Sequence, residues 1–307
     1  MAHKVFIDGA AGTTGLEIAD RLATRPEFTM LVLGDDARKD ADARRAALNE
    51  ADFAILCLPD DAAREAVVLA LGSAVRIIDA STAHRVALNW TYGFPELVGA
   101  ETVANAKRVS NPGCYPTGFL GLLAPLVRAG LLPPDWPYTC NAVSGYSGGG
   151  KALIARYEDD HDIAWQGYAL GLGHKHVREM QTHAGLYVPP LFTPAVIPAH
   201  RGMVVEIPLQ LAAMPGAVSP DALREELARF YAGSAIVTVR DEQPDELLLR
   251  GSTPASDRLD LYVFGAANGS QARLVAVLDN LGKGASGAAV QSLNLMAGLP
   301  QEAGLAL

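Results

Sequence analysis

The sequence has few cysteines and no long apolar run, and each shortage excludes a class of protein. Three cysteines in 307 residues are too few for a disulfide scaffold, so we expect free thiols in a reducing, cytoplasmic setting. A membrane-spanning helix needs about 20 consecutive apolar residues, and no such run is present. The opening stretch holds an aspartate and a glycine cluster, unlike a secretory signal. We therefore expect no membrane association.

Basic residues are also scarce. Lys and Arg total 25 against 34 Asp and Glu, which gives a net charge of −9. Nucleic-acid-binding proteins usually carry a basic patch, so we expect no nucleic-acid partner. Charged residues make up 19% and hydrophobic residues 50%, which excludes a disordered chain. A chain of this length buries roughly three quarters of its surface on folding, enough for one large domain or two ordinary ones.

The first third of the chain alternates short apolar runs with amphipathic stretches. Strands are predicted, in chain order, at residues 5–8, 28–33, 53–58 and 75–80. Helices are predicted between them at 17–23, 40–48 and 61–71, the last with Asp60 or Asp61 as its cap. Apolar strands that alternate with helices are typical of a parallel sheet covered on both faces. The fold class predicted for this part is therefore α/β.

The pattern changes after residue 113. Strands are predicted at 138–143, 258–263 and 272–278, with one or two more over 196–211. The last two predicted strands flank Asn268-Gly269, a strong hairpin signal. Helices are predicted at 151–157, 219–232 and 286–299. This part indicates an α+β domain with a mixed or antiparallel sheet.

A glycine-rich turn follows the first predicted strand and precedes the first helix. Its sequence runs from Gly9 through Gly12 to Gly15 with a GxxGxxG spacing, not the stricter GxGxxG of many dinucleotide sites. Glycine lets the backbone approach a pyrophosphate, and the helix N-terminus offers free N–H groups to it. The simpler alternative is a tight turn that binds nothing. Its position between strand and helix favours a Rossmann-type nucleotide site.

The type of nucleotide is left open by the residues after the second predicted strand. Asp35 or Asp36 is suited to bind a ribose, as in NAD sites. Arg38 and Lys39, which follow directly, are suited to bind the 2′-phosphate of NADP. Each of these four residues is equally compatible with an ordinary charged surface loop.

Cys114 lies in the most informative segment of the chain. It follows Asn111-Pro112-Gly113 and begins an apolar run, residues 119–127, that predicts a buried helix. Free N–H groups and the helix dipole at a first helical turn stabilise a thiolate, the form that acts as a nucleophile. Pro116 is tolerated in a first turn. Cys57 and Cys140 lie inside apolar runs and are interpreted as core residues.

A nucleophilic cysteine needs a proton donor, and the His174-Lys175-His176 segment is the best candidate. It follows a glycine-rich loop and precedes a helix predicted from about Val177. Two histidines at i and i+2 of an extended segment point the same way. A metal pair is the alternative, but no third ligand has suitable spacing, so we expect no metal.

Several segments, in the same order, resemble the N-acetyl-γ-glutamyl-phosphate reductase family. They are residues 9–15, 111–117, 143–148, 174–176, 199–203 and 280–285, and together the similarity spans essentially the whole chain. The short length and the segments 79–85 and 92–96 resemble the shorter of the family's two forms. One departure is Arg178, where the family usually has a proline; a helix start tolerates either residue.

The resemblance implies an oxidoreductase of arginine biosynthesis, related to aspartate-semialdehyde dehydrogenase. It implies NADPH-dependent reduction of N-acetyl-γ-glutamyl phosphate to N-acetylglutamate semialdehyde, with release of phosphate, through a thioester on the cysteine. It also implies two domains: an NADP-binding Rossmann domain over 1–113, completed by a C-terminal helix within 286–307, and a catalytic and dimerisation domain over 114–285. A homodimer or homotetramer that acts on a small molecule is expected.

The resemblance also assigns the site residues. Cys114 is the nucleophile, and His176 or His174 is the acid/base, with His176 favoured because it adjoins the helix. Cofactor contacts are implied for Gly9, Ala11, Gly12, Thr13, Thr14, Gly15, Arg38, Pro59, Ser81 and Gly284. Substrate contacts are implied for Arg108, Asn111, Ser144, Ser147 and Arg201.

Two other functions compete with this interpretation. One is a different acyl-phosphate reductase, acting on aspartyl phosphate or a longer amino-adipyl analogue, because the cysteine and dinucleotide arguments serve all of these. The other is a non-catalytic regulator that binds the dinucleotide without turnover. The regulator predicts a thiol of ordinary reactivity at position 114.

Overall fold

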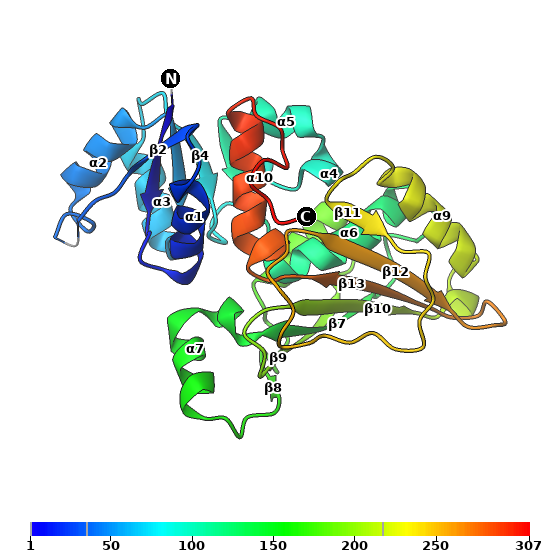
Figure 1. The fold of residues 1–307 in the computed structure, drawn as a ribbon. Coiled ribbons are helices and arrows are strands. Elements are labelled where there is room, and N and C mark those ends of the chain that lie inside the picture. Colours follow the sequence, from blue (N-terminus) through cyan, green and yellow to red (C-terminus); the bar gives the residue numbers. More distant parts are fainter. Residues whose placement is uncertain (1, 35, 217) are drawn as a thin grey trace. The chain divides into compact units, whose positions relative to one another are not determined.

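The structure is a computed structural model that describes residues 2–34, 36–216 and 218–307 (Figure 1). The chain divides into two compact units. Unit 1 contains the chain up to Gly113 together with Ala285–Leu305, and unit 2 contains Cys114–Gly284 with Ala306–Leu307. Among the described residues, no helix has the length and apolarity that crossing a membrane requires.

The described part of unit 1 forms a six-stranded sheet in the order β2-β1-β3-β4-β6-β5, with every neighbouring pair parallel. Its strands are β1 (His3–Asp8), β2 (Phe28–Leu31), β3 (Phe53–Leu56), β4 (Arg76–Asp79), β5 (Thr91–Tyr92) and β6 (Arg108–Ser110). Its helices are α1 (Thr13–Ala23), α2 (Ala41–Glu50), α3 (Asp60–Leu69), α4 (Pro95–Val98), α5 (Ala100–Ala104) and α10 (Gly287–Met296). The α/β prediction for this part of the chain is confirmed.

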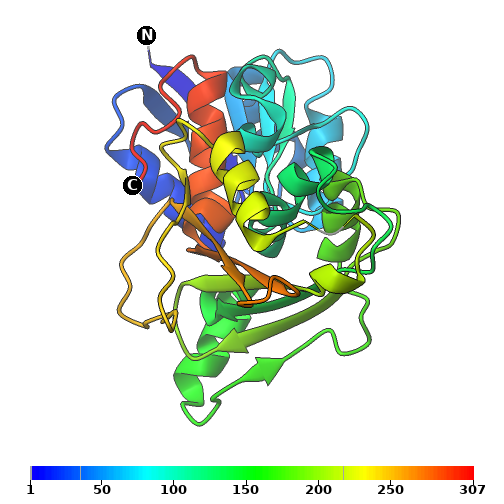
Figure 2. The same ribbon diagram turned by 90° about the vertical axis from the view of Figure 1, so that its right-hand side faces the viewer.

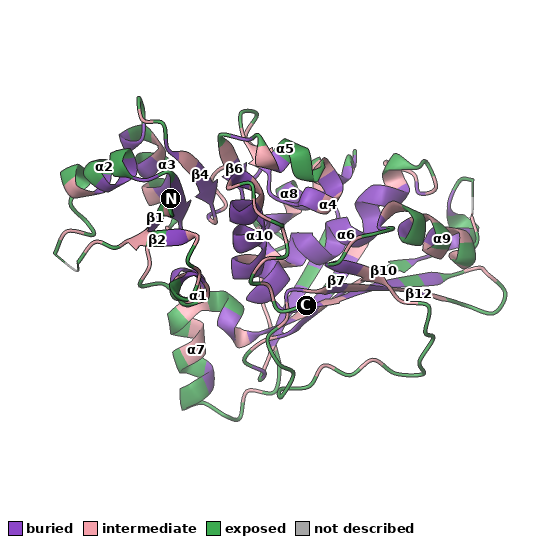
Figure 3. Cartoon of the chain, turned by 45° about the horizontal axis from the view of Figure 1, so that its top comes forward, coloured by how far each residue is buried: buried purple, intermediate pink, exposed green. Residues whose placement is uncertain are grey.

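Helices cover both faces of this sheet. Successive side chains of a strand point to opposite faces, so each strand contributes to both cores. Val5 and Ile7 of β1 belong to one core with residues of α1, α5 and α10, whereas Phe6 belongs to a second core with α2 and α3. Figure 3 shows most of β4 and of α10 in the colour of buried residues, whereas the end of β2 has the colour of intermediate ones. The strand order reverses between β1 and β3, and ligands of open α/β sheets bind at such a point.

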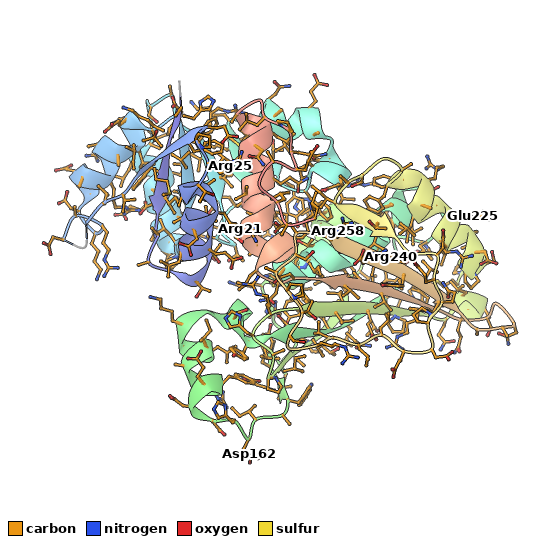
Figure 4. The ribbon with its side chains drawn as sticks, viewed as in Figure 1. Arg21, Arg25, Asp162, Glu225, Arg240 and Arg258 are labelled. Atoms are coloured by element: carbon orange, nitrogen blue, oxygen red, sulfur yellow. The ribbon has the colours of Figure 1, made fainter. Side chains whose placement is uncertain are left out.

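Polar contacts hold α10 within unit 1. The Arg25 guanidinium, labelled in Figure 4, donates to Asn294 Oδ1 at 3.3 Å and to the Ala303 carbonyl at 2.7 Å. Asn294 Nδ2 donates in turn to the carbonyls of Gln301 and Ala303. A helix near the end of the sequence therefore packs in the same unit as a sheet formed by residues near its beginning.

The start of α3 differs from the prediction. Its N-cap is Pro59, not Asp60 or Asp61, and Asp60 is the first helical residue. The Asp60 carboxylate instead accepts a hydrogen bond from the Thr82 amide at 2.9 Å. An aspartate that bonds a neighbouring loop is not available to cap its own helix, which explains the difference.

The described part of unit 2 contains a mixed seven-stranded sheet in the order β11-β12-β13-β10-β7-β9-β8. The strands are β7 (Thr139–Gly145), β8 (Gln166–Gly167), β9 (Leu191–Ile197), β10 (Met203–Leu209), β11 (Val237–Val239), β12 (Leu259–Gly265) and β13 (Ala272–Leu278). The helices are α6 (Cys114–Arg128), α7 (Gly150–Asp159), α8 (His176–Ala184) and α9 (Pro220–Phe230). Figures 1 and 2 show α6 and α9 together on one face of this sheet.

The structure bears on the predicted hairpin and on the one or two strands predicted over 196–211. Strands β12 and β13 pair in antiparallel fashion around Gly269, which has φ +69°, so the hairpin is confirmed. The run at 196–211 spans the end of β9 and all of β10, so it contains parts of two strands, with a turn between them that contains Gly202 at φ +103°. Pro198 and the segment His200-Arg201-Gly202 lie in this turn and interrupt the apolar pattern. Mixed pairing in this sheet confirms the α+β prediction.

Candidate active site

Cys114 is the first residue of α6, as the sequence predicts. Cys114 forms no disulfide, and it is half-buried. The first amide groups of a helix have no acceptor within the helix, and the helix dipole is positive at this end. A thiolate or an oxyanion at this position is therefore stabilised by the backbone of α6.

The other two cysteines are placed differently. Cys57 directly follows β3 and packs against the core of unit 1, and burial raises the pKa of its thiol to about 12. Cys140 lies in β7, fully buried, and burial likewise raises the pKa of its thiol. Both are neutral core thiols at physiological pH.

The backbone at Gly284 lies directly against Cys114. Gly284 belongs to a π-helical turn, Gly282–Ser286, and its N–H donates to the Asp279 carbonyl at 2.9 Å. A Cβ at position 284 would lie 2.9 Å from Cys114 Cβ and 3.0 Å from Asp279 O. Only glycine permits this approach, so Cys114 faces peptide backbone there.

Tyr115 connects the cysteine to the two candidate histidines. Its ring centroid lies 6.4 Å from that of His174 and 5.9 Å from that of His176. Its hydroxyl donates to the Ala195 carbonyl at 3.1 Å, and burial raises its pKa. The residue that follows the nucleophile therefore packs against both histidines.

The histidine pair is folded into a turn, and the predicted extended segment is wrong. Lys175 has helical backbone angles, φ −57° and ψ −26°, because α8 begins at His176, one residue earlier than the sequence indicates. The two ring centroids lie 4.6 Å apart. The His176 amide donates to Nδ1 of His174 at 3.1 Å. This bond requires His174 Nδ1 to be unprotonated, so His174 supports the backbone of His176.

The segment 279–284 contacts two further residues predicted for unit 2, Arg201 and Ser147, and it contains a third, Gly284. Asp279 Oδ2 accepts from the Arg201 guanidinium at 2.9 Å. Asn280 Nδ2 donates to Ser147 Oγ at 2.9 Å, and Asn280 Oδ1 accepts from the Gly202 amide at 2.9 Å. The same segment ends at Gly284, against Cys114.

Ser144 lies in β7, three residues before Ser147. Its buried hydroxyl donates to the Gly145 carbonyl at 3.0 Å. Contacts therefore link Cys114 to Gly284 and, through the neighbouring Tyr115, to His174 and His176. A second set, Arg201 and Ser147, is joined to Gly284 through the chain segment 279–284.

The prediction missed several residues of this group. Asp279, Glu179 and Lys283 are all buried, with Lys283 only 2% exposed. Tyr168 contacts His174 with ring centroids 5.6 Å apart. Glu179 lies one helical turn after His176, and this spacing was a signal that the sequence offered. Nothing local in the sequence distinguishes Tyr168 from the other eight tyrosines of the chain.

In unit 1 the glycine-rich turn has the predicted position between β1 and α1. Gly9 has φ +90°, and a Cβ there would lie 2.3 Å from the Cys57 carbonyl oxygen. A Cβ at Gly15 would lie 2.5 Å from the Gly9 oxygen. Gly12 differs: its φ is −79°, and a Cβ would only make an ordinary 3.5 Å contact. Packing thus explains Gly9 and Gly15 but not Gly12.

The other predicted residues of unit 1 follow the carboxyl ends of neighbouring strands. Ala11, Thr13 and Thr14 follow β1, Arg38 follows β2, Pro59 follows β3, Ser81 follows β4 and Asn111 follows β6. Parallel strands bring these ends to one edge, where open α/β sheets bind ligands. Arg38 is exposed, and Asp36 and Lys39 lie in the same loop. Asp35 lies outside the described residues.

Asp79, at the end of β4, orients the loop that carries Ser81. The fully buried carboxylate accepts from the Ser81 amide at 2.9 Å and from its hydroxyl at 2.8 Å. His84 Nδ1 hydrogen bonds to the same carboxylate at 2.6 Å. The sequence predicted a site role for Ser81 but none for Asp79 or His84.

Arg108 is placed differently from the others. It is the first residue of β6, at the amino end of the strand, whereas Asn111 follows the carboxyl end. Its guanidinium lies over the Trp90 ring, 5.9 Å from the centroid.

Within the described ranges, no group of three or more His, Cys, Asp or Glu side chains is arranged to hold a metal ion.

The parallel sheet with its glycine-rich turn and the helix that begins with a cysteine define a protein of the semialdehyde dehydrogenase class. Residues 4–106 match the family described as semialdehyde dehydrogenase, NAD binding domain, and residues 114–280 match semialdehyde dehydrogenase, dimerisation domain. Two solved structures have the same fold. One is aspartate semialdehyde dehydrogenase II from Vibrio cholerae, with TM-score 0.70, 17% identity, and coverage of 96% of this chain and 98% of that one. The other is aspartate semialdehyde dehydrogenase with NADP from Candida albicans, with TM-score 0.68, 16% identity, and coverage of 97% and 99%.

Sequence comparison narrows the class to one branch. The N-acetyl-gamma-glutamyl-phosphate reductase 2 of Nostoc sp. is 50% identical over 98% of this chain and 99% of its own length. The N-acetyl-gamma-glutamyl-phosphate reductase of Burkholderia ambifaria is also 50% identical, over 96% of each chain. The chain belongs to the N-acetyl-gamma-glutamyl-phosphate reductase family.

Proposed function

We propose that this protein reduces N-acetyl-γ-glutamyl phosphate with NADPH to N-acetylglutamate semialdehyde and phosphate, a step of arginine biosynthesis. The observation that carries the proposal is Cys114, a cysteine outside any disulfide at the first residue of α6, in a chain about half identical to reductases of this name over nearly its whole length. In this proposal unit 1, which includes α10, is the NADP-binding domain, and unit 2 is the catalytic and dimerisation domain.

The residues of unit 1 fit a dinucleotide. Gly12 is the N-cap of α1 with no side-chain cap, and neither its backbone angles nor its neighbours require glycine. A missing side chain there keeps the helix N-terminus open to a pyrophosphate. The turn from Gly9 to Gly15, with Ala11, Thr13 and Thr14, would hold the pyrophosphate, and Arg38 the 2′-phosphate. Pro59, Ser81 and, in unit 2, Gly284 complete the proposed cofactor contacts.

Cys114 starts the reaction. Its thiolate attacks the acyl-phosphate carbonyl, and the carbonyl oxygen becomes an oxyanion that N–H groups at the start of α6 stabilise. The oxyanion collapses, the bond to the phosphate oxygen breaks, and a thioester remains on Cys114. When bound, NADPH supplies the hydride that reduces this thioester.

His176 supplies the proton that the reaction needs. It protonates the oxygen that hydride addition makes anionic, and it takes this proton back as the C–S bond breaks, so that the aldehyde leaves and the Cys114 thiolate is regenerated. His174 holds the His176 amide through Nδ1, so it positions the acid. The 4.6 Å separation of the two rings fits this division of roles.

The polar side chains predicted from the sequence would bind the substrate. Arg201 carries a positive charge held by Asp279, and such guanidinium groups bind carboxylate or phosphate. Ser144 and Ser147 offer hydroxyl groups in unit 2, and Asn111 offers an amide in unit 1. Arg108 has the weakest support of these residues, because its guanidinium lies over Trp90.

The protein is further proposed to be a cytoplasmic homodimer or homotetramer with no nucleic-acid or membrane partner. The match of residues 114–280 to a family described as a dimerisation domain supports an oligomer. Light scattering of the purified protein measures its mass directly.

A coupled assay tests the proposed function. The reverse reaction is followed as phosphate-dependent reduction of NADP⁺ by N-acetylglutamate semialdehyde, with NAD⁺, aspartate semialdehyde and the amino-adipyl analogue as comparisons. Cys114→Ser should lose essentially all activity, since an alcohol is a poor nucleophile at neutral pH. Cys140→Ala, in the core of unit 2, is the matched control and should stay active. Near wild-type activity in Cys114→Ser, or faster turnover of another semialdehyde, would contradict the proposal.

A further inference from the structure

Asp279 directly follows β13, and its buried carboxylate is held by donors on both oxygens. Oδ2 accepts from the Arg201 guanidinium at 2.9 Å and from the Ser256 amide at 3.2 Å. Oδ1 accepts from the Leu281 amide at 2.9 Å. Because only 5% of the side chain is exposed, these bonds fix the carboxylate in one orientation. The guanidinium that it binds is therefore fixed as well.

The backbone of Arg201 is fixed by β7 and the residues that follow it. In the turn between β9 and β10, the Gly202 carbonyl accepts from the Gly145 amide at 2.8 Å, and the His200 carbonyl accepts from the Ser147 amide at 3.2 Å. A Cβ at Gly145 would lie 2.8 Å from Arg201 Cα, so the two segments are in close contact. The Arg201 side chain is nevertheless 20% exposed. A guanidinium that is fixed and still accessible is suited to bind an anion.

Asp279 also connects Arg201 to the nucleophile. Its carbonyl accepts from the Gly284 amide at 2.9 Å. A Cβ at Gly284 would lie 3.0 Å from that carbonyl oxygen and 2.9 Å from Cys114 Cβ. Asp279 thus binds the guanidinium through its side chain, and through its backbone it binds the glycine that lies against Cys114. One residue and one turn therefore set the separation between an anion held at Arg201 and the sulfur of Cys114.

The charges at this position favour a carboxylate over a phosphate group as the anion. Arg201 and Asp279 form an ion pair without net charge. The cost of removing an ion from water grows with the square of its charge, whereas its attraction to a neutral pair grows only in proportion to the charge. A singly charged carboxylate is therefore bound more readily here than a doubly charged phosphate.

We propose that Asp279 determines the chain length of the substrate: it places Arg201 so that the guanidinium binds the α-carboxylate while the acyl-phosphate carbonyl reaches Cys114. The assignment rests on the proposed function and adds a specificity determinant to it. Asp279 is a positioning residue, because it acts through Arg201 and not on the reacting atoms. An acyl phosphate with one methylene more or less cannot match both ends, and misplacement by about 1 Å costs roughly 100-fold in rate.

Semialdehydes of different length test the assignment in the reverse reaction. The N-acetylated semialdehydes of aspartate, glutamate and 2-aminoadipate differ by one methylene at each step. Wild type should prefer the glutamate compound by about 100-fold in kcat/KM. In Asp279→Asn, which keeps the side-chain shape but removes the charge, that preference should fall to about tenfold or less. An equal loss for all three compounds would show a merely structural role and overturn the assignment.

Two further variants sharpen this comparison. Adding Asp279→Asn to Arg201→Met should cause no further loss, because Asp279 acts through Arg201; multiplied effects would overturn the assignment. The matched control is Asp260→Asn. It removes the carboxylate of the Arg240–Asp260 pair of unit 2, also 2.9 Å long, whose arginine is labelled in Figure 4. This variant should keep the wild-type preference.

Alkylation of Cys114 tests the same geometry without NADPH or an acyl phosphate. Iodoacetyl derivatives of glycine, β-alanine and γ-aminobutyrate carry a carboxylate at increasing distance from the reactive carbon, and their methyl esters lack the charge. In wild type, one of the acids should react about tenfold faster than its ester, the effect of one hydrogen bond to a charged group. The preference should disappear in Asp279→Asn, whereas iodoacetamide should alkylate both proteins equally.

The alkylation result and the turnover result can fail separately. Without turnover of N-acetylglutamate semialdehyde by wild type, the proposed function fails. If no acid reacts faster than its ester, or if Asp279→Asn keeps the preference, the assignment of Asp279 fails. Thermal unfolding and the iodoacetamide rate show whether Asp279→Asn is folded. Should it not fold, Asp279→Glu is used: it keeps the charge but moves the guanidinium, and an unchanged length preference would overturn the assignment.

Discussion

At the residue scale, the three cysteines show how position decides chemistry. Burial raises the pKa of the thiols of Cys57 and Cys140, and at Cys57 the carboxylates of Asp79 and Asp8 raise it further. Cys114 has the same side chain but is the first residue of a helix. The difference lies entirely in what surrounds the sulfur.

Thiol labelling tests this difference. At pH 8 the folded protein should react with one equivalent of a thiol reagent, because the pKa of Cys57 is about 12 and that of Cys140 is also raised. In denaturant all three cysteines should react. Cys114→Ser should give no fast equivalent when folded and two when unfolded. Rapid labelling of a second thiol in the folded protein would show that a core cysteine is accessible.

At the element scale, the β1–α1 turn contains glycines with two different purposes. Gly9 is required by its positive φ and by the Cys57 carbonyl, and Gly15 by the oxygen of Gly9. Gly12 is required by neither. The spacing in the sequence makes the three look equivalent, and only the contacts across the turn separate packing from ligand approach.

Substitutions at two glycines of this turn should therefore affect different quantities, the free energy of unfolding for Gly9 and NADPH binding for Gly12. Gly9→Ala should lower the free energy of unfolding by about 1–3 kcal/mol from backbone strain, with the clash against Cys57 adding to it. Gly12→Ala should change that free energy by less than about 1 kcal/mol. It should weaken NADPH binding by about tenfold or more, or 1.4 kcal/mol. Denaturant unfolding and a fluorescence titration with NADPH measure the two quantities. Unimpaired binding in Gly12→Ala would argue against a pyrophosphate at this turn.

At the scale of the whole molecule, unit 1 is assembled from both ends of the sequence. Leu293 of α10 is fully buried in one core with Val5 and Ile55. Arg25 adds polar contacts to the same helix. The stability of the first strands therefore depends on residues that are far away in the chain.

Hydrogen exchange tests this dependence. Leu293→Ala should destabilise unit 1 by about 2–5 kcal/mol, the usual cost of such a core truncation. Amide exchange should accelerate in β1 and β3, while β12 and β13 change little. Leu227→Ala, at a buried position of α9 in unit 2, is the matched control and should accelerate exchange in unit 2. Equal acceleration in both units from either variant would show that they unfold as one.

The sequence by itself determined most of the elements, the fold class and the family, and it singled out Cys114 among the three cysteines. These features are local: alternation of apolar runs, a glycine turn between strand and helix, and the segment around Cys114. Only the tertiary structure decided the Arg201–Asp279 ion pair, the hydrogen bond between Asn280 and Ser147, and the contact of Tyr115 with the histidine pair. The physical reason is that these depend on close approach between segments distant in the chain, as where Gly284 meets Cys114. No local pattern records which residues will meet.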